Sequence, residues 1–127
     1  MYYLPQEIEV WYIIPAIRRE LSKELVKKHK MTLEMVGNAL GVSKAAISQY
    51  LSKKRGGSVK LAEKIKNEIK ISANSISENK TEAFHEIMRL LRICKTEGVS
   101  CISCRKFNKE VLDHCKMKPH HYDIDLK

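Results

Sequence analysis

The sequence predicts an all-α protein, and three observations carry this prediction. Apolar residues recur at helical spacing through most of the 127 residues. No segment sustains the alternation of apolar and polar residues that indicates a β-strand. Serine or threonine precedes several of the periodic segments and glycine follows several of them, as is typical of helix caps.

The first predicted helix lies in the segment IIPAIRRELSKELVKKHK. Its apolar residues repeat at every fourth position, at Ile13, Ile17, Leu21 and Leu25. Pro15 suits a first helical turn, where no backbone N–H is needed. A second, short helix follows Thr32 as its cap, with Glu34 near its positive end, and it stops at Gly41.

Two more helices are predicted between Gly41 and residue 71. Ser43 can cap a third helix that runs to about Lys54, where the glycine pair 56–57 ends it. Ser58 can cap a fourth helix. The apolar stripe of this fourth helix consists of Leu61, Ala62, Ile65 and Ile69.

The polar stretch SANSISENK, residues 72–80, is rich in serine and asparagine and is predicted to be a linker. One face of a fifth helix then carries Phe84, Ile87, Met88, Leu91 and Cys94. Gly98 ends this helix, and a last helix is predicted over about residues 105–115. The predicted organisation is therefore a first domain at 10–71, a linker, and a C-terminal segment at 81–118.

The charge of the chain favours a polyanionic partner. It carries 24 lysines and arginines against 15 acidic residues, with a net charge of +9 and a pI near 9.4. No acid falls between Glu34 and Glu63. Five basic residues lie in that interval, at Lys44, Lys53, Lys54, Arg55 and Lys60. The positive charge is therefore concentrated on one segment.

Catalysis and membrane insertion are not expected. The chain has no nucleotide-binding loop, no nucleophile elbow and no H-E-x-x-H metal motif. No stretch approaches the ~20 apolar residues that a membrane span needs. Its beginning has an apolar run but neither a basic n-region nor a cleavage site. The sequence predicts a cytoplasmic protein that is not an enzyme.

The segment LEMVGNALGVSKAAISQYLSKK, residues 33–54, is typical of a helix-turn-helix. Gly37 stands where the two helices cross most closely, and Gly41 stands where the turn needs φ > 0. Apolar residues occupy the positions that pack between the helices, namely Val36, Leu40, Val42, Ile47 and Leu51. An ordinary helical hairpin with a solvated basic face is the alternative interpretation.

Several polar and small residues of this segment are predicted to contact DNA. The N-terminal half of the second helix, which enters the major groove in such motifs, points outward with Ser43, Lys44, Ala45, Ser48 and Gln49. Gln49 can pair with a base edge, and the serines can reach phosphate or base. Neighbouring phosphates suit the basic run Lys53, Lys54 and Arg55. The sequence predicts a regulator that binds double-stranded operator DNA.

The stretch GVSKAAISQYLSKKRGG resembles the recognition-helix region of lambda-repressor-like (XRE-type) transcription regulators. The preceding segment is similar to an archaeal branch of these regulators that carries a cysteine-containing C-terminal extension. The resemblance implies a compact bundle of four to five helices that binds operator DNA, usually as a homodimer. Leu33 stands where members of the family often have glutamine.

All four cysteines lie within residues 94–115, with the spacing C-x6-C-x2-C-x10-C. In a reducing compartment, clustered cysteines more often bind metal than form structural disulfides. Four thiolates can hold zinc or an iron–sulfur cluster. The predicted ligands are Cys94, Cys101, Cys104 and Cys115.

A 4Fe-4S cluster is favoured over zinc, because CISCRK lacks the glycine or proline that is common around the C-x2-C turn of zinc knuckles. The run C-x6-C-x2-C also resembles the cluster loop of endonuclease III-type glycosylases, where the last gap is shorter. His114 could replace Cys115 in a zinc site. The alternatives are that Cys94 and Cys115 are core thiols, or that Cys101 and Cys104 form a reversible disulfide.

The leading hypothesis is a DNA-binding transcription regulator whose cysteine site stabilises the fold or responds to metal or redox state. The alternative from a different class is an RNA- or protein-interaction module with a purely structural zinc site. Tyr50 is the one aromatic residue of the basic segment that could stack on a base, which argues against recognition of single strands.

Overall fold

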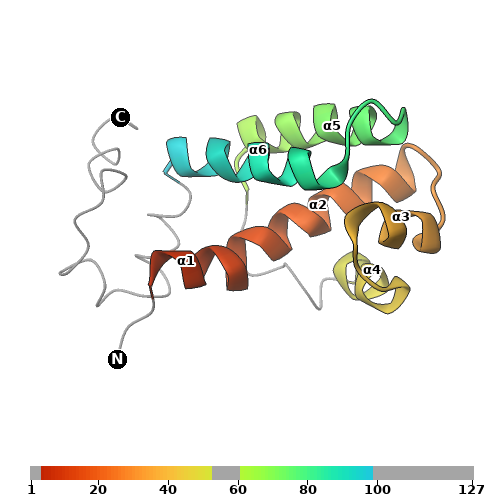
Figure 1. Ribbon diagram of the computed structural model, residues 1–127, viewed down its shortest axis with the longest axis horizontal. Coiled ribbons are helices and arrows are strands. Elements are labelled where there is room, and N and C mark those ends of the chain that lie inside the picture. Colours follow the sequence, from red (N-terminus) through yellow and green to blue (C-terminus); the bar gives the residue numbers. More distant parts are fainter. Residues whose placement is uncertain (1–3, 53–60, 99–127) are drawn as a thin grey trace.

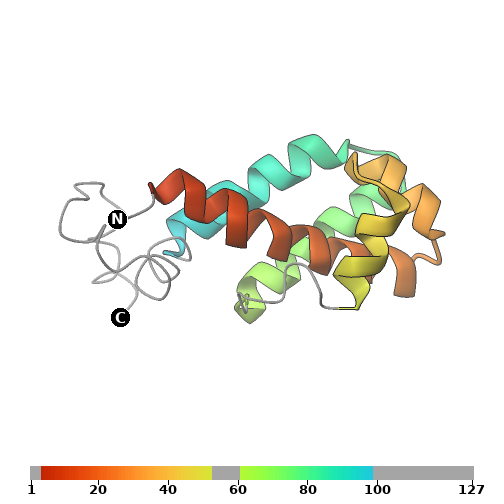
Figure 2. The same cartoon turned by 90° about the horizontal axis from the view of Figure 1, so that it is seen from below.

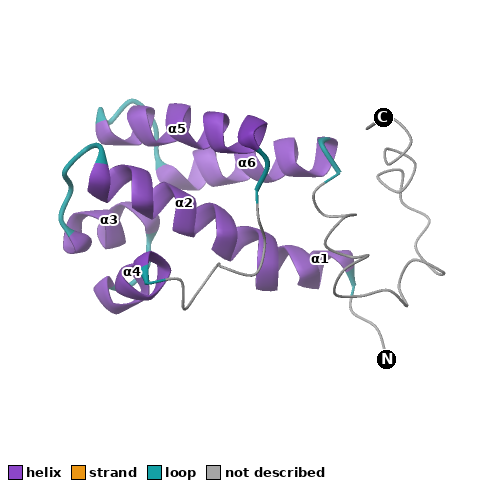
Figure 3. Cartoon of the chain, turned by 180° about the vertical axis from the view of Figure 1, so that it is seen from behind, coloured by secondary structure: helices purple, strands orange, loops and turns teal. Residues whose placement is uncertain are grey.

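A computed structural model of the chain describes residues 4–52 and 61–98, and every regular element in these ranges is a helix (Figure 3). The predicted all-α fold class is confirmed. The elements are α1 (Pro5–Ile8), a π-helical turn (Glu9–Ile13), α2 (Ile14–Lys27), α3 (Leu33–Leu40), α4 (Lys44–Leu51), α5 (Glu63–Ser77) and α6 (Ala83–Thr96). None of these helices is long and apolar enough to cross a membrane.

Helix α2 is the centre of the bundle and packs against α3, α4, α5 and α6. Helices α5 and α6 lie side by side along it, while α3 and α4 lie together at one end (Figure 1). The predicted four-residue repeat is confirmed as the buried face, since Ile13, Ile17, Leu21 and Leu25 are all 0% exposed. Ile47, Ile65, Ile69 and Leu90 complete the fully buried aliphatic core from the other helices.

The first helix begins earlier than Pro15 suggested. Helical backbone runs from Pro5 through the π-helical turn into α2, and Ile13 is itself in a right-handed helical conformation. Pro15 cannot donate a backbone hydrogen bond, and its ring crowds the carbonyl four residues before it. A π-helical turn directly before the proline is one way in which a helix accommodates this disruption. Pro15 therefore lies in the first turn of α2, as predicted, but the helical backbone itself already begins at Pro5.

The predicted linker at 72–80 is wrong over residues 72–77, whereas residues 78–80 do lie between α5 and α6. Helix α5 runs to Ser77, and Ser72, Ala73 and Ile76 are buried. These residues continue the apolar stripe of Ile65 and Ile69, so packing against α2 outweighs the low helix propensity of serine and asparagine. Helix α5 also begins later than expected, at Glu63 after Ala62, which contributes no side-chain cap. The expected cap, Ser58, lies outside the described residues.

A polar cluster joins α5 to α6. Arg89 donates from Nη1 to Glu68 Oε1 at 2.7 Å and from Nη2 to Ser72 Oγ at 2.7 Å. The Ser72 hydroxyl donates in turn to Glu86 Oε1 at 2.6 Å. Burial alone would lower the pKa of Arg89, but its hydrogen bond to Glu68 and the charge of Glu86 raise it above the ordinary value. Ser72, at the start of the predicted linker, is therefore a buried anchor between two packed helices.

Helix α6 crosses over the beginning of α2 and diverges from it toward α3 (Figure 2). Ala83, Leu90 and Cys94 are buried, whereas Phe84 is 67% and Met88 is 47% exposed. The predicted apolar face of this helix is thus wider than the surface that the bundle covers. Gly98 follows the helix with φ 76°, which confirms it as the residue that ends α6.

Candidate nucleic-acid interface

Gly37 allows α3 to approach the turn that precedes α4. A Cβ atom at this position would lie 2.8 Å from the carbonyl oxygen of Val42, which is a backbone atom. Any side chain would therefore force the turn away from α3. The predicted need for a residue without a side chain at Gly37 is confirmed, and the close contact is with the turn before α4.

The turn itself depends on Gly41, which has φ 73° in the left-handed region. No atom lies within 4 Å of a Cβ placed there, so the need for glycine is conformational and not a matter of space. The N–H of Val42 donates to the Gly37 carbonyl at 2.9 Å and closes the turn. The two glycines thus act by different physical effects.

Both helices of the motif begin with a side-chain cap, as predicted. The Thr32 hydroxyl oxygen accepts from the N–H of Met35 at 3.1 Å, and the Ser43 hydroxyl oxygen accepts from the N–H of Ala46 at 3.0 Å. Because Ser43 uses only an acceptor lone pair in this cap, its hydroxyl proton remains available to an external oxygen.

The inward face of the motif is apolar. Val36, Leu40 and Ile47 are buried, whereas Val42 and Leu51 are half-buried. Tyr50 also points inward and is 3% exposed. Its ring is therefore not available to stack on a nucleic-acid base.

The outward face of α4 carries the predicted DNA-contacting residues. Ser43, Lys44, Ala45 and Ser48 are exposed and Gln49 is half-buried. They come from the cap and the first two turns of α4, at the end of the bundle away from α1 (Figure 1). The Lys44 ammonium has no ion-pair partner within residues 4–52 and 61–98. This face can donate hydrogen bonds and attract an anion.

The predicted phosphate-binding run Lys53, Lys54 and Arg55 lies outside the described residues. Its role remains a prediction from the sequence.

Of the four predicted metal ligands, the structure describes Cys94 alone. Its side chain is 0% exposed, and burial raises the pKa of its thiol to about 12, with a further rise from the Glu9 carboxylate. Metal ligation needs the thiolate, so a metal ion bound at Cys94 would have to displace this proton. Cys101, Cys104 and Cys115 lie outside the described residues. Within them, no three histidine, cysteine or acidic side chains gather into a metal site.

The comparison with known proteins agrees with this geometry. Residues 23–76 match the model of a family described as helix-turn-helix. The chain carries a helix-turn-helix domain. The match extends through α4 into α5 and ends at Ile76, so it includes most of the stretch that resembled a linker. Domains of this kind are typical of DNA-binding transcription regulators. No curated protein and no solved structure matches the chain significantly.

Proposed function

We propose that this protein is a sequence-specific regulator of transcription that binds double-stranded operator DNA and has no enzymatic activity. The observation that carries the proposal is the outward face of α4, which presents Lys44, Ala45 and Ser48 beside a turn of helix-turn-helix geometry. The net charge of +9 supports a polyanionic partner. A cytoplasmic location, in contact with the chromosome, belongs to the same proposal.

In this mechanism the N-terminal half of α4 enters the major groove. Gln49 pairs with the edge of an adenine, and Ala45, with its small exposed side chain, lets the helix approach a thymine methyl group. Lys44 contacts the edge of a guanine. Ser43 and Ser48 donate to phosphate oxygens and fix the register, while the basic run 53–55 supplies further phosphate contacts.

The RNA-binding alternative loses support from one observation. Recognition of single-stranded nucleic acid generally relies on exposed aromatic rings that stack on bases. Tyr50, the aromatic residue of the basic segment, is 3% exposed and packs in the core. A duplex read through its groove edges needs no such ring.

The proposal includes a homodimer, because two copies of a small reading helix contact two half-sites one helical turn apart and so lengthen the recognised sequence. The four-cysteine metal site remains a prediction from the spacing of the cysteines. Zinc or a 4Fe-4S cluster would supply four metal–thiolate bonds there. Iron, sulfide and zinc content after oxygen-free purification tests it. Metal-free protein with four free thiols would remove the metal-responsive part of the proposal.

Selection of bound sequences from a random duplex pool tests the DNA-binding part. Full-length protein is expected to enrich a defined motif. With that motif in hand, Gln49→Ala and Lys44→Ala should each reduce the preference for it over random duplex, by roughly 1–3 kcal/mol for a lost base contact. Lys95→Ala is the matched control, since Lys95 is also exposed but lies at the far end of α6.

Failure to enrich any motif would contradict sequence-specific binding. Equal losses on selected and random duplex for Gln49→Ala would contradict its base-reading role alone.

A further inference from the structure

An apolar hollow of about 380 Å³ lies between α2, the C-terminal end of α3 and α6. Its volume falls in the lower part of the range of small-molecule pockets in proteins. The large apolar side chains of its lining are those of Ile14, Leu40, Phe84, Ile87, Met88 and Leu91. Phe84 and Met88 are exposed, so a bound molecule would cover apolar surface that the bundle leaves in water.

Arg18 also lines this hollow and is the one cationic residue among the described residues of its wall. The Nε atom of Arg18 is buried and has no hydrogen-bond partner among the residues that the structure describes. Arg18 also has no ion pair with any residue of the described ranges. Its neighbour Arg19 has an unpartnered Nε as well, but its Nη1 lies 2.6 Å from Glu20 Oε2. The guanidinium of Arg18 is therefore an unpaired cation at an apolar surface.

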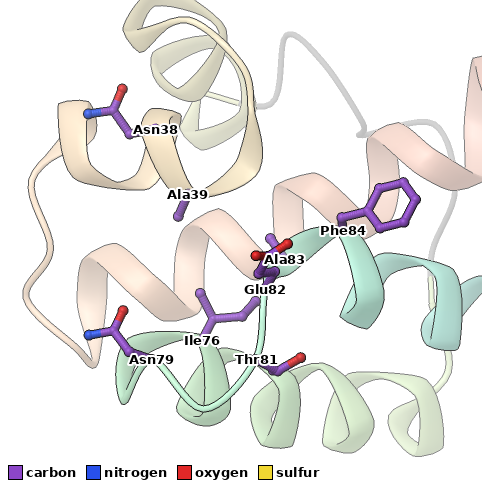
Figure 4. A pocket seen from close by; sticks show the side chains of 8 residues that line it. All are labelled: Asn38, Ala39, Ile76, Asn79, Thr81, Glu82, Ala83 and Phe84. Atoms are coloured by element: carbon purple, nitrogen blue, oxygen red, sulfur yellow. The ribbon is translucent and has the colours of Figure 1, made fainter.

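A second depression next to the hollow lacks this combination. It is lined by Asn38 and Ala39 of α3, by Ile76 and Asn79, and by residues 81–84 (Figure 4). Its one charged residue is Glu82. The ring of Phe84 points away from Asn38, Ala39 and Ile76 in this view. Apolar walls and a free positive charge coincide in the first hollow and not in the second.

We propose that the hollow at Arg18 binds a small anionic amphiphile, a carboxylate with an apolar tail. The carboxylate accepts hydrogen bonds from the Arg18 guanidinium, which a carboxylate can meet with two oxygens at once. The tail lies against Ile14, Ile87 and Leu91. The Met88 side chain at the rim is flexible and can adjust to tails of different shape.

The hollow lies directly beside the helix-turn-helix. Leu40 and Gly41, at the end of α3 and in the turn before α4, form part of its wall. A ligand held there contacts α6 and this turn together. Binding of the amphiphile does not depend on the proposed DNA-binding function, so it is measured without DNA, and failure of either proposal is distinguishable from failure of the other.

Calorimetric titration of the full chain with octanoate and with octanol tests the site. The two probes share a tail and differ in the carboxylate. We expect saturable binding of octanoate, about tenfold or more tighter than that of octanol, because octanoate alone can form an ion pair with Arg18 and accept with two oxygens at once.

Substitutions separate the charge from the cavity. Arg18→Gln should weaken octanoate about tenfold and leave octanol unchanged. Met88→Glu, at an exposed rim position that tolerates a charge, should also weaken octanoate by repulsion. Arg92→Gln is the control, because Arg92 is an exposed arginine of α6 that does not line the hollow.

Three outcomes would overturn the proposal: no saturable binding of octanoate, equal affinity for octanoate and octanol, or unchanged octanoate binding by a folded Arg18→Gln variant. A fourth outcome is that the chain forms a dimer, that Met88→Glu dissociates this dimer, and that octanoate does not bind. This result would assign the hollow to a second copy of the chain and would also overturn the proposal. Thermal unfolding of each variant establishes that it is folded.

Discussion

The helix-turn-helix at residues 32–51 and the helix α6 use their apolar residues differently. In the first region, Val36, Leu40 and Ile47 are buried and the polar face of α4 is exposed. In the second region, Phe84 and Met88 stay exposed although they lie on the apolar face. In the first region the conformation depends on close backbone contacts within the motif itself. In the second region the burial of each apolar residue depends on which neighbouring helices cover it, and they leave Phe84 and Met88 exposed.

Truncation of an apolar residue in each region should have very different effects. Ile47→Ala removes a side chain that is 0% exposed and should lower the free energy of unfolding by about 2–5 kcal/mol. Met88→Ala removes one that is 47% exposed and should cost less than about 1 kcal/mol. Urea denaturation of the two variants measures both values. Similar losses would mean that Met88 is covered in solution.

Substitutions of the two glycines test why the helix-turn-helix needs glycine at each position. Gly37→Ala should cost about 1–3 kcal/mol because its Cβ meets the Val42 carbonyl, and Gly37→Asn should cost more. Gly41→Ala should cost about 1 kcal/mol through backbone strain alone.

Gly41→Asn should recover much of that loss, since asparagine tolerates the left-handed conformation. Denaturation midpoints of the four variants test this pattern. Rescue by asparagine at both positions, or at neither, would contradict the distinction between contact and conformation.

Substitution of Ser43 separates stability from DNA binding within the same region. Ser43→Ala should cost about 0.5–2 kcal/mol through loss of the cap to Ala46. Ser43→Asp keeps a capping oxygen and should restore stability, but its charge faces the DNA phosphates and should weaken binding. Melting curves and gel shifts measure the two effects. Ser43→Asp protein that binds DNA like the wild type would place Ser43 away from the phosphates.

Alkylation of the cysteines tests whether Cys94, near the end of α6, is a buried core thiol or part of a metal site. Cys94 is 0% exposed and its thiol pKa is raised to about 12, so it should react at pH 8 only when the protein opens. Mass spectrometry of the labelled chain reports each cysteine separately. Protection of Cys94 alone supports the core-thiol interpretation. Protection of all four cysteines until a chelator is added supports the metal site.

The sequence was most informative where one residue satisfies one local constraint. Gly37, Gly41 and Ser43 were each predicted with their correct role, because a close approach, a positive φ and a helix cap each favour few residue types. The buried face of α2 followed from the repeat of Ile13 and Ile17 in the same way.

Where tertiary contacts decide, the sequence was less informative. Ser72 suggested a linker, because serine favours loops and its buried partners Glu86 and Arg89 lie on the next helix. Arg18 was missed as a candidate site residue, since nothing in the stretch IRRE distinguishes it from Arg19. Only the position of Glu20 on the folded helix pairs one arginine and leaves the other free.

The central claim is that α4 reads double-stranded DNA. A competition experiment tests it most directly, in which the selected duplex, random duplex, single-stranded DNA and RNA compete for binding to the full chain. The account predicts that the selected duplex competes best, and that Gln49→Ala reduces its advantage over random duplex by roughly 1–3 kcal/mol while leaving random-duplex affinity nearly unchanged. Equal competition by RNA or single strands, or a selected duplex whose advantage survives Gln49→Ala and Lys44→Ala together, would contradict it.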